Sequence, residues 1–260
     1  MHASAAYRIE THMKFKIVVP TYNTEHWIAR CLHSIQSQTY GDFECVVYDD
    51  ASTDNTGAVI DHFFSERPDP RFRIIHNEKN VKALANIVSG FEELETKKDP
   101  ESVLMVIDGD DFLYSEYVLE MVKGAYDNTR SWLTYGNHVH WPTGQISLNC
   151  RPFPPEIHQN RSYRSYPFIS SHLRTFKSKL WNAIRDEDLR DEDGRYYGSA
   201  WDVAFMLPML EMAGADRILY IPNILYCYNR FNPISDDQIR QPDQHRIEKR
   251  VRSGKKYDLF

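Results

Sequence analysis

The sequence lacks a long hydrophobic run. None of its apolar segments approaches the roughly 20 residues that a helix needs to span a bilayer, and its first residues do not show the basic, apolar and small-residue order of a secretion signal. It also has no internal repeat and no low-complexity segment. We therefore expect a soluble, cytoplasmic protein without a transmembrane segment, able to work at the periphery of a membrane.

The sequence contains few cysteines and no excess of positive charge. No two cysteines form a CxxC pair, so neither a zinc site nor a disulfide framework is indicated, and a reducing compartment is the simplest interpretation. The net charge of −6 argues against a surface that wraps nucleic acid. The cysteines are Cys31, Cys45, Cys150 and Cys227.

Strands and helices alternate through the first half in units of about 30 residues, which predicts βαβ crossovers and a mostly parallel sheet with helices on both faces. Apolar runs predict strands at 15–19, 43–48, 72–76 and 103–107, and apolar residues at three- and four-residue spacing predict helices at 25–38, 56–64 and 80–94. Ligands of such sheets bind at the carboxyl ends of the strands. The polar loops 20–24, 49–56 and 108–111 should converge there.

The stretch Asp108-Gly109-Asp110-Asp111 follows the strand at 103–107 directly. Three carboxylates beside a buried strand are costly unless a positive group offsets them, and a divalent cation that bridges two phosphates would do so. Gly109 would let a ligand approach the backbone closely. This predicts a site for a nucleoside diphosphate and a metal ion. The alternative is that the aspartates cap a helix beginning near Ser115.

The second half has a weaker pattern. It predicts a helix near 115–125, a strand at 132–141, a loop over or beside the site at 142–165, a helix at 176–184, a charged surface loop at 185–195, an apolar helix at 201–212 that Pro208 kinks or breaks, a strand pair at 217–221 and 224–228, and a polar tail after Pro233.

Four motifs in register resemble the family 2 glycosyltransferases of the GT-A fold over residues 14–125. They are Pro20-Thr21-Tyr22-Asn23, the helix end Leu32-x-x-Ile35-x-x-Gln38-Thr39, Asp49-Asp50-Ala51-Ser52-Thr53-Asp54, and Asp108-Gly109-Asp110-Asp111. The resemblance implies a Rossmann-like α/β sheet with a C-terminal acceptor-side region. It also implies a hexosyltransferase that uses a UDP-sugar and inverts the anomeric centre.

The resemblance assigns donor-binding residues position by position. Pro20, Tyr22 and Asp50 match positions that hold uracil and ribose, where an aromatic ring stacks on the base and a carboxylate accepts from the uracil N–H. Asp108 and Asp110 match the DXD motif, which binds the ribose and a Mn²⁺ or Mg²⁺ ion on the pyrophosphate.

Two further residues belong to this donor site. Asp111 follows the DXD motif as a supporting ligand. Lys82 stands where many relatives have a Gly and an Arg nearby, and it supplies charge to the donor phosphates or is a solvated lysine at a helix start.

The acceptor side resembles a subset of the family. His172 and Arg174 lie in a segment like the one that lines the sugar and acceptor, although His172 is equally well explained as a structural residue, and whether it binds metal, phosphate or acceptor stays open. Trp201 and Asp202 match the region of the general base. Asp202 is acidic in an apolar stretch, so we expect burial to raise its pKa, and the alternative is a helix N-terminal carboxylate.

Other residues in this half are assigned less specifically. Arg151, Arg161 and Arg164 either meet an anionic acceptor or are solvated, and Tyr226-Cys227-Tyr228-Asn229 is interpreted as packing.

These assignments divide the chain into four parts. Residues 1–13 are a disordered leader or a remnant of the expression vector, 14–125 form the nucleotide-sugar-binding half, 126–240 form the acceptor-binding and catalytic-base half, and 241–260 form a tail. The acceptor is a glycan, a lipid-linked molecule or a protein. Two alternative functions stay open, a nucleotidyltransferase acting on a sugar phosphate and a non-catalytic nucleotide- or carbohydrate-binding module. The first usually needs a Gly-rich loop that 20–23 does not provide.

Overall fold

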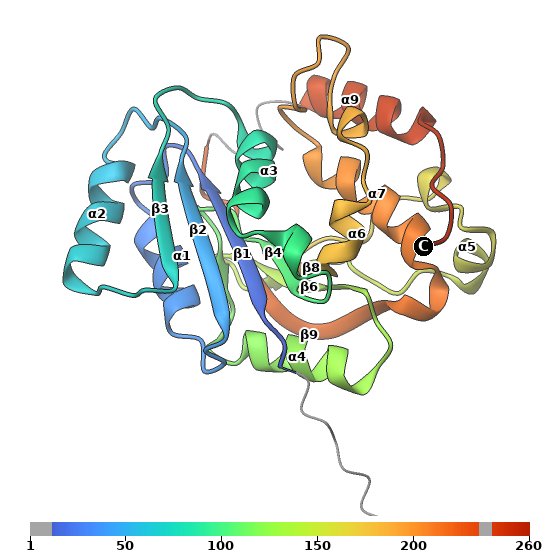
Figure 1. Ribbon diagram of the computed structural model, residues 1–260, viewed down its shortest axis with the longest axis horizontal. Helices are drawn as coiled ribbons and strands as arrows, with labels where there is room; N and C mark the ends of the chain where they lie inside the picture. The colour runs from blue at the N-terminus through green and yellow to red at the C-terminus, as the bar shows by residue number, and fades with distance from the viewer. Residues whose placement is uncertain (1–11, 234–240) are drawn as a thin grey trace, which may run out of the picture.

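The computed structural model describes residues 12–233 and 241–260, and its centre is one mixed sheet. The strand order is β3-β2-β1-β4-β8-β6-β9-β5, with β7 paired to β6 (Figure 1). This confirms the predicted α/β class. The strands are β1 (Phe15–Thr21), β2 (Phe43–Asp49), β3 (Phe72–His76), β4 (Val103–Val106), β5 (Phe112–Leu113), β6 (Leu133–Trp141), β7 (Gln145–Ile146), β8 (Arg174–Lys177) and β9 (Ile218–Asn229).

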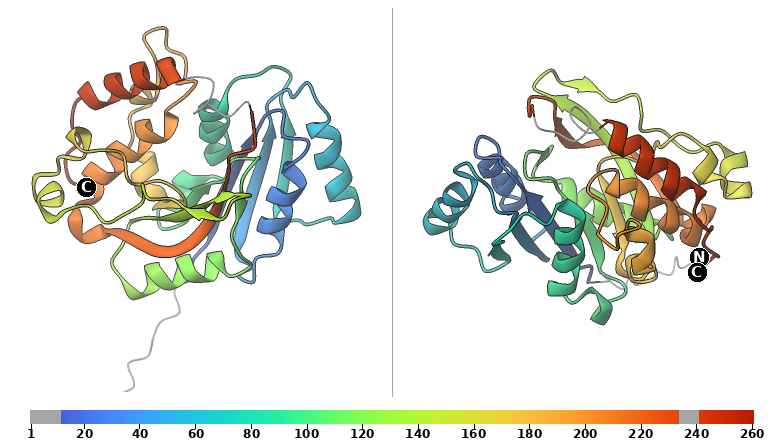
Figure 2. Two further views of the ribbon diagram at one scale, coloured as in Figure 1. Left: turned by 180° about the vertical axis from the view of Figure 1, so that it is seen from behind. Right: turned by 90° about the horizontal axis from the view of Figure 1, so that it is seen from above.

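Helices cover both faces of the sheet, because alternate residues of its central strands point to opposite sides. On β1, Val18 belongs to the core cluster with α3, α6, α7 and α9, and Val19 belongs to the cluster with α1, α2 and α4. Figure 2 shows α1 and α2 at one end of the molecule and α7 and α9 at the other. The helices are α1 (Ile28–Gln36), α2 (Thr56–Glu66), α3 (Ala83–Glu93), α4 (Val118–Asn128), α5 (Pro155–Asn160), α6 (Ser178–Asn182), α7 (Trp201–Ala213) and α9 (Gln241–Ser253), with 3-10 turns η1 (Thr96–Lys98), η2 (Tyr163–Ser165), η3 (Asp186–Leu189) and η4 (Ala215–Arg217).

The first half of the sheet is parallel throughout. Strand β1 is buried over its whole length and pairs in parallel with β2 on one side and β4 on the other, and β2 pairs in parallel with β3. The carboxyl ends of these strands therefore open at one edge, as predicted. Antiparallel pairing begins where β8 joins β4.

The second half differs from the sequence prediction in several elements. Residues 174–177 form strand β8, and only 178–182 of the predicted helix 176–184 are α-helical. The predicted strand pair at 217–221 and 224–228 is one strand, β9, since the irregularity at Pro222-Asn223 is absorbed by register shifts against β6. The predicted loop 142–165 contains β7, α5 and η2.

The C-terminal segment was predicted as a weakly patterned tail, and this was wrong. It forms helix α9, which buries Ile247 and Val251, one turn apart, against α7. Pro208 lies inside α7 without ending it. At the other terminus, residues 1–11 of the predicted leader lie outside the described residues, and Met13 is already buried. Within residues 12–233 and 241–260, no helix combines the length and hydrophobicity needed to cross a membrane.

Candidate active site

A cavity of about 490 Å³ opens at the carboxyl edge of the sheet. Its walls come from the loops after β1 and β4, the loop before α3, strand β8 and the start of α7, and α9 adds Gln244. Sequence segments far apart in the chain thus meet at one site. Every residue that the sequence predicted for the site lines this cavity: Pro20, Tyr22, Asp50, Lys82, Asp108, Asp110, Asp111, His172, Arg174, Trp201 and Asp202.

Asp50, just after β2, holds the loop that leads into α3. Its carboxylate accepts hydrogen bonds from the backbone N–H of Val81 at 2.9 Å, the backbone N–H of Lys82 at 2.8 Å and the side-chain amide of Asn77 at 2.8 Å. A carboxylate offers about four lone-pair positions, so it retains capacity for a ligand donor. Asp50 therefore has a structural role that the sequence did not reveal, beside the base-binding role predicted for it.

Lys82 lies on the wall of the cavity in a backbone conformation that favours glycine. Its φ is +76°, and a non-glycine residue in such a region costs about 1–3 kcal/mol. The hydrogen bond from its N–H to Asp50 helps to hold this conformation. The side chain is exposed, so its ammonium group is available to a ligand in the cavity.

The loop that carries Asp108, Asp110 and Asp111 packs tightly against β1. A Cβ atom at Gly109 would lie 2.2 Å from Thr21 Oγ1 and 2.4 Å from Thr21 Cβ. Glycine is therefore required at position 109 because the loop lies against β1. The sequence predicted a different reason, the close approach of a ligand to the backbone. The alternative in which these aspartates cap the next helix is wrong, because α4 begins only at Val118 and has no side-chain cap.

Three side chains in this loop and on the facing segment fit a divalent cation. Asp108, Asp111 and His172 each place one ligand atom within 4.8 Å of the other two. Asp111 Oδ2 is buried without a hydrogen-bond partner among the described residues, so it is open to a cation. Carboxylate oxygens are the preferred ligands of hard divalent ions such as Mg²⁺ and Mn²⁺, and imidazole is a common ligand of first-row transition metals. Asp110 instead accepts a hydrogen bond from the Asn232 amide at 2.7 Å.

The pKa values of Asp108, Asp111 and His172 are shifted toward the uncharged form of each group. Burial raises the pKa of Asp111 well above its usual value, and the charges of Asp110 and Asp108 raise it further. Burial raises the pKa of Asp108 to about 6, against the lowering effect of Arg174. Burial and then Arg174 lower the pKa of His172, so the imidazole is neutral. Its Nε2 accepts from Nη2 of Arg174 at 2.8 Å, and a cation bound at this nitrogen would replace that hydrogen bond. A bound cation would favour the ionised carboxylates.

Asp202 stands in the first turn of α7 and forms an ion pair across the cavity. Its Oδ2 is 2.9 Å from Nη1 of Arg174, and Nη2 of Arg174 is 2.8 Å from Nε2 of His172. Trp201 packs its ring 5.6 Å from the same guanidinium group. The expected burial of Asp202 is not found, since its carboxylate is only half-buried and faces a buried arginine, and its place in the first turn of α7 is that of the alternative, a helix N-terminal carboxylate.

The end of β9 contributes residues that sequence reasoning missed. The backbone N–H of Asn229 donates to Asp111 Oδ1 at 2.7 Å, and the hydroxyl of Tyr226 accepts from the backbone N–H of Asp108 at 3.2 Å. Each of these two hydrogen bonds joins residues that are 118 positions apart in the chain. The short sequence Tyr-Cys-Tyr-Asn contains no motif that predicts contact with the aspartates.

Two of the arginines considered for an anionic acceptor have structural partners instead. Arg164 donates to both carboxylate oxygens of buried Glu211, at 2.8 and 3.0 Å, and to the backbone of Val251 on α9. Arg161 donates to the backbone oxygens of Glu211 and Tyr257. These bonds fix the C-terminal segment against α7. Arg151 donates at 3.5 Å to the backbone of Leu148.

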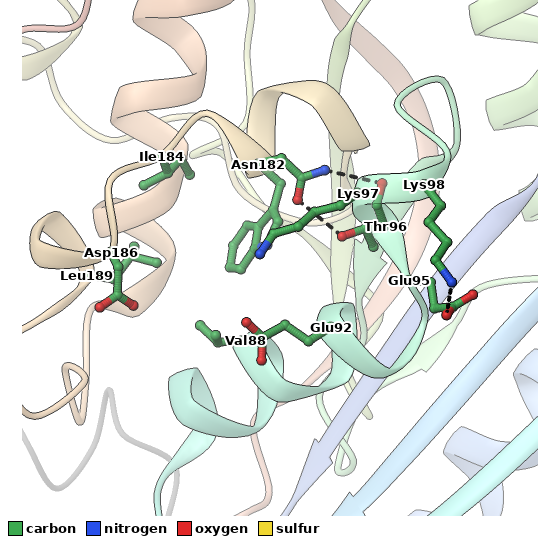
Figure 3. Close-up of a pocket in the computed structure, with 11 residues that line it drawn as sticks. Val88, Glu92, Glu95, Thr96, Lys97, Lys98, Asn182, Ile184, Asp186 and Leu189 are labelled. Carbon is green, nitrogen blue, oxygen red and sulfur yellow. Dashed lines mark hydrogen bonds and ion pairs between the residues drawn. The ribbon is translucent and has the colours of Figure 1, made fainter.

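A second pocket, of about 460 Å³, lies between the far end of α3, η1, α6 and η3. Figure 3 shows Glu92 and Asn182 on its walls, with Asn182 hydrogen-bonded to Thr96 and Lys98 paired with Glu95. It shares no lining residue with the first cavity. The half-buried amide of Asn182 is hydrogen-bonded within the chain, to Thr96 and Ser178.

Comparison of the fold with solved structures defines the class of protein. TarS 1-349 from S. aureus, in complex with UDP-GlcNAc, superposes with a TM-score of 0.64 at 18% identity, over 92% of this chain and 65% of that fragment. The mannosyltransferase PcManGT from Pyrobaculum calidifontis, in complex with GDP-Man and Mn²⁺, gives a TM-score of 0.61 at 19% identity, over 95% of this chain and 67% of that protein. The fold is that of the GT-A glycosyltransferases.

The sequence identifies the family. The profile described as Glycosyl transferase family 2 matches residues 16–184, and the chain belongs to this family. The glycosyltransferase GlyG of Streptococcus pneumoniae is 26% identical over 229 residues, which are 82% of this chain and 70% of GlyG. The predicted family and enzyme class are confirmed. This chain spans 65% of TarS 1-349 and 39% of the longer TarS structure.

Proposed function

We propose that this chain transfers a sugar from a UDP-sugar to an acceptor hydroxyl in the cavity at the carboxyl edge of the sheet. The observation that carries the proposal is the convergence of two groups of side chains on one cavity. One group, around Asp50 and Asp108, suits a nucleoside diphosphate, and the other, Arg174 and Asp202, suits an acceptor. Sugar transfer needs both substrates held in one geometry.

The donor would occupy the side of the cavity formed by the first half of the chain. Pro20 and Tyr22 offer a surface for the base, and Asp50 retains a lone pair for the uracil N–H. TarS holds UDP-GlcNAc and PcManGT holds GDP-Man. We choose uridine because the family resemblance assigns Asp50 to the uracil N–H and because TarS 1-349 binds UDP and UDP-GlcNAc. Lys82 would contribute positive charge at the diphosphate.

A divalent metal, Mn²⁺ or Mg²⁺, would be held by Asp108, Asp111 and His172, with Asp110 of the DXD motif as a further candidate ligand. When bound, such an ion supplies Lewis-acid stabilisation of the charge that develops on the departing diphosphate. The complex of PcManGT with Mn²⁺ supports a metal in this fold.

The acceptor reaction needs a base, and we assign this role to Asp202. Its carboxylate takes the proton of the acceptor hydroxyl while the acceptor oxygen forms a bond to the anomeric carbon. The bond from that carbon to the diphosphate oxygen breaks, and its electron pair leaves with UDP, so the configuration inverts. Arg174 holds Asp202 by a hydrogen bond to Oδ2, which orients the carboxylate while lone pairs remain for the incoming proton.

The acceptor class is a glycan, a lipid-linked molecule or a protein, met in the cytoplasm or at a membrane surface. Gln244 on α9 and Trp201 on α7 border this side of the cavity, so the second half of the chain would set the choice.

Thermal unfolding with a panel of nucleotides tests the proposal. A ligand that binds only the folded protein raises the melting temperature by mass action, so UDP and UDP-sugars should raise it, more so with Mn²⁺, and one UDP-sugar should raise it most. GDP and GDP-Man serve as controls. A rise with guanine nucleotides alone would contradict the uridine assignment. Release of pyrophosphate from UTP with a sugar phosphate would favour a nucleotidyltransferase, and UDP-sugar binding without transfer to any acceptor would favour a binding module.

A further inference from the structure

Tyr226 lies in β9, beneath the carboxylate cluster. It is fully buried, and it pairs with Leu113 of β5 and with His138 of β6. Its sequence context predicts only a packing role. Its hydroxyl and its ring nevertheless contact two of the three residues that fit a cation, Asp108 and His172.

The first contact is with Asp108. The hydroxyl oxygen of Tyr226 accepts a hydrogen bond from the backbone N–H of Asp108 at 3.2 Å, at the point where the chain leaves β4. This bond fixes the backbone from which the Asp108 carboxylate projects.

The second contact is with His172, whose ring stacks on the ring of Tyr226. The ring centroids are 4.7 Å apart and the planes are inclined by only 13°. A stacked partner restricts rotation of the imidazole and so sets the direction of its nitrogen atoms. On its other edge His172 is hydrogen-bonded by Ser171, at Nδ1, and by Arg174, at Nε2.

Strand β9 also holds Asp111, through Asn229. The backbone N–H of Asn229, three residues after Tyr226 in the strand, donates to Asp111 Oδ1 at 2.7 Å. The strand that carries Tyr226 thus contacts Asp108 and Asp111 as well as His172.

We propose that Tyr226 is a positioning residue of the cation site, because one side chain orients the backbone of Asp108 and the imidazole of His172 together. The inference rests on the metal assignment in the proposed function. Residues that orient metal ligands without touching the metal change metal affinity by about 10- to 100-fold when they are replaced. Loss of the Tyr226 hydroxyl should have an effect of this kind, although the residue does not line the cavity.

The test compares two buried tyrosines. Tyr226→Phe removes the hydroxyl and keeps the ring. Tyr126→Phe is the matched control, because Tyr126 is also buried and its hydroxyl bonds to Thr175 at 3.1 Å, away from the cavity. For each full-length protein, Mn²⁺ binding is measured by titration calorimetry in the presence of UDP. UDP binding without metal and the melting temperature are measured beside it.

We expect Tyr226→Phe to raise the dissociation constant of Mn²⁺ by about 10-fold, with UDP binding without metal changed less than about twofold. Tyr126→Phe should lower the melting temperature to a similar extent and leave Mn²⁺ binding unchanged. A Tyr226→Phe protein that binds Mn²⁺ as tightly as the wild type overturns the inference, as does an equal loss in Tyr126→Phe.

Two further arms complete the test. If Tyr226→Phe shows no cooperative unfolding, Tyr226→His replaces it, because the shorter ring cannot bring a polar atom to the hydroxyl position, and the same weakening is expected. If the wild type with UDP binds no Mn²⁺, the metal assignment fails and this inference fails with it. Wild-type binding with an unaffected variant overturns this inference alone.

Discussion

Arg174 and Asp202 form an ion pair with 2.9 Å between Nη1 and Oδ2, where β8 and α7 meet at the cavity. The guanidinium group is almost completely buried, whereas the carboxylate keeps 27% of its side-chain surface exposed. The exposed carboxylate is the partner that a substrate can reach. The buried arginine also bonds to His172, so it links the acceptor side of the cavity to the candidate cation site.

This geometry predicts the effect of Asp202→Asn. The amide keeps the shape of the side chain and cannot take a proton, so kcat should fall by about 100-fold or more while the dissociation constant of UDP stays within about twofold. Steady-state transfer kinetics and UDP titration measure the two effects. A melting temperature close to that of the wild type is needed as a control, because Arg174 loses its charged partner. Wild-type turnover would remove Asp202 from the role of base.

The aspartates after β4 should respond differently to replacement. Asp110→Asn keeps an oxygen for the bond from Asn232 and should stay folded, with transfer reduced by about 100-fold or more. Asp111→Asn removes a buried carboxylate that is costly without a cation, so the metal-free protein should melt at the same or a higher temperature than the wild type. Its rise in melting temperature with Mn²⁺ should be lost. Full turnover in Asp110→Asn would exclude it as a ligand.

Gly109→Ala should disturb both stability and donor binding. The new methyl group would overlap Thr21 in β1, and such overpacking costs about 1–3 kcal/mol. Gly124→Ala is the matched control, because no atom lies within 4 Å of a Cβ there and its position within α4 favours alanine by about 0.5–1 kcal/mol. Denaturant unfolding of the two variants should show opposite signs. Equal stabilities would mean that the loop adapts without cost.

Two replacements of Lys82 distinguish the effect of its backbone conformation on stability from the effect of its ammonium group on donor binding. Lys82→Gly relieves the conformation at φ +76° and Lys82→Ala does not, so the glycine variant should be the more stable of the two by about 1 kcal/mol. Both lose the ammonium group and should bind a UDP-sugar about fivefold more weakly. If both variants bind the donor as the wild type does, Lys82 is a solvated lysine and has no part in the site.

His76 gives the donor half a pH dependence. Burial works against its charged form, but hydrogen bonds to Asp49 and Asp61 outweigh this effect and raise its pKa above 6.5. The stabilisation is therefore complete below the unfolded pKa and is lost as pH rises through the higher folded pKa. Its size is about 0.5 kcal/mol, because 40% of the side chain is exposed. The stability difference between wild type and His76→Gln should shrink from pH 6 to pH 8. A stability difference that stays constant between pH 6 and pH 8 would contradict the raised pKa of His76.

Sequence patterns could predict the convergence of the polar loops because these loops follow strands with long apolar runs. The loops at 20–24 and 108–111 sit where parallel strands end, so topology alone brings them together. The ion pair of Asp202 could not be predicted, since Arg174 lies 28 residues away on a strand of only four residues. Helix α9 could not be predicted because, among its described side chains, only Ile247 and Val251 are apolar and buried, and two such residues make no recognisable helical pattern.

The change from parallel to antiparallel pairing between β4 and β8 has an evolutionary consequence. Within the parallel side, Asp50 holds the loop before α3, whereas the aspartates after β4 are also held by β9. The segment 142–165 and α9 are anchored separately, through Arg164. A lineage can therefore exchange or lengthen these two segments while the loops of the parallel side and the end of β9 are inherited unchanged.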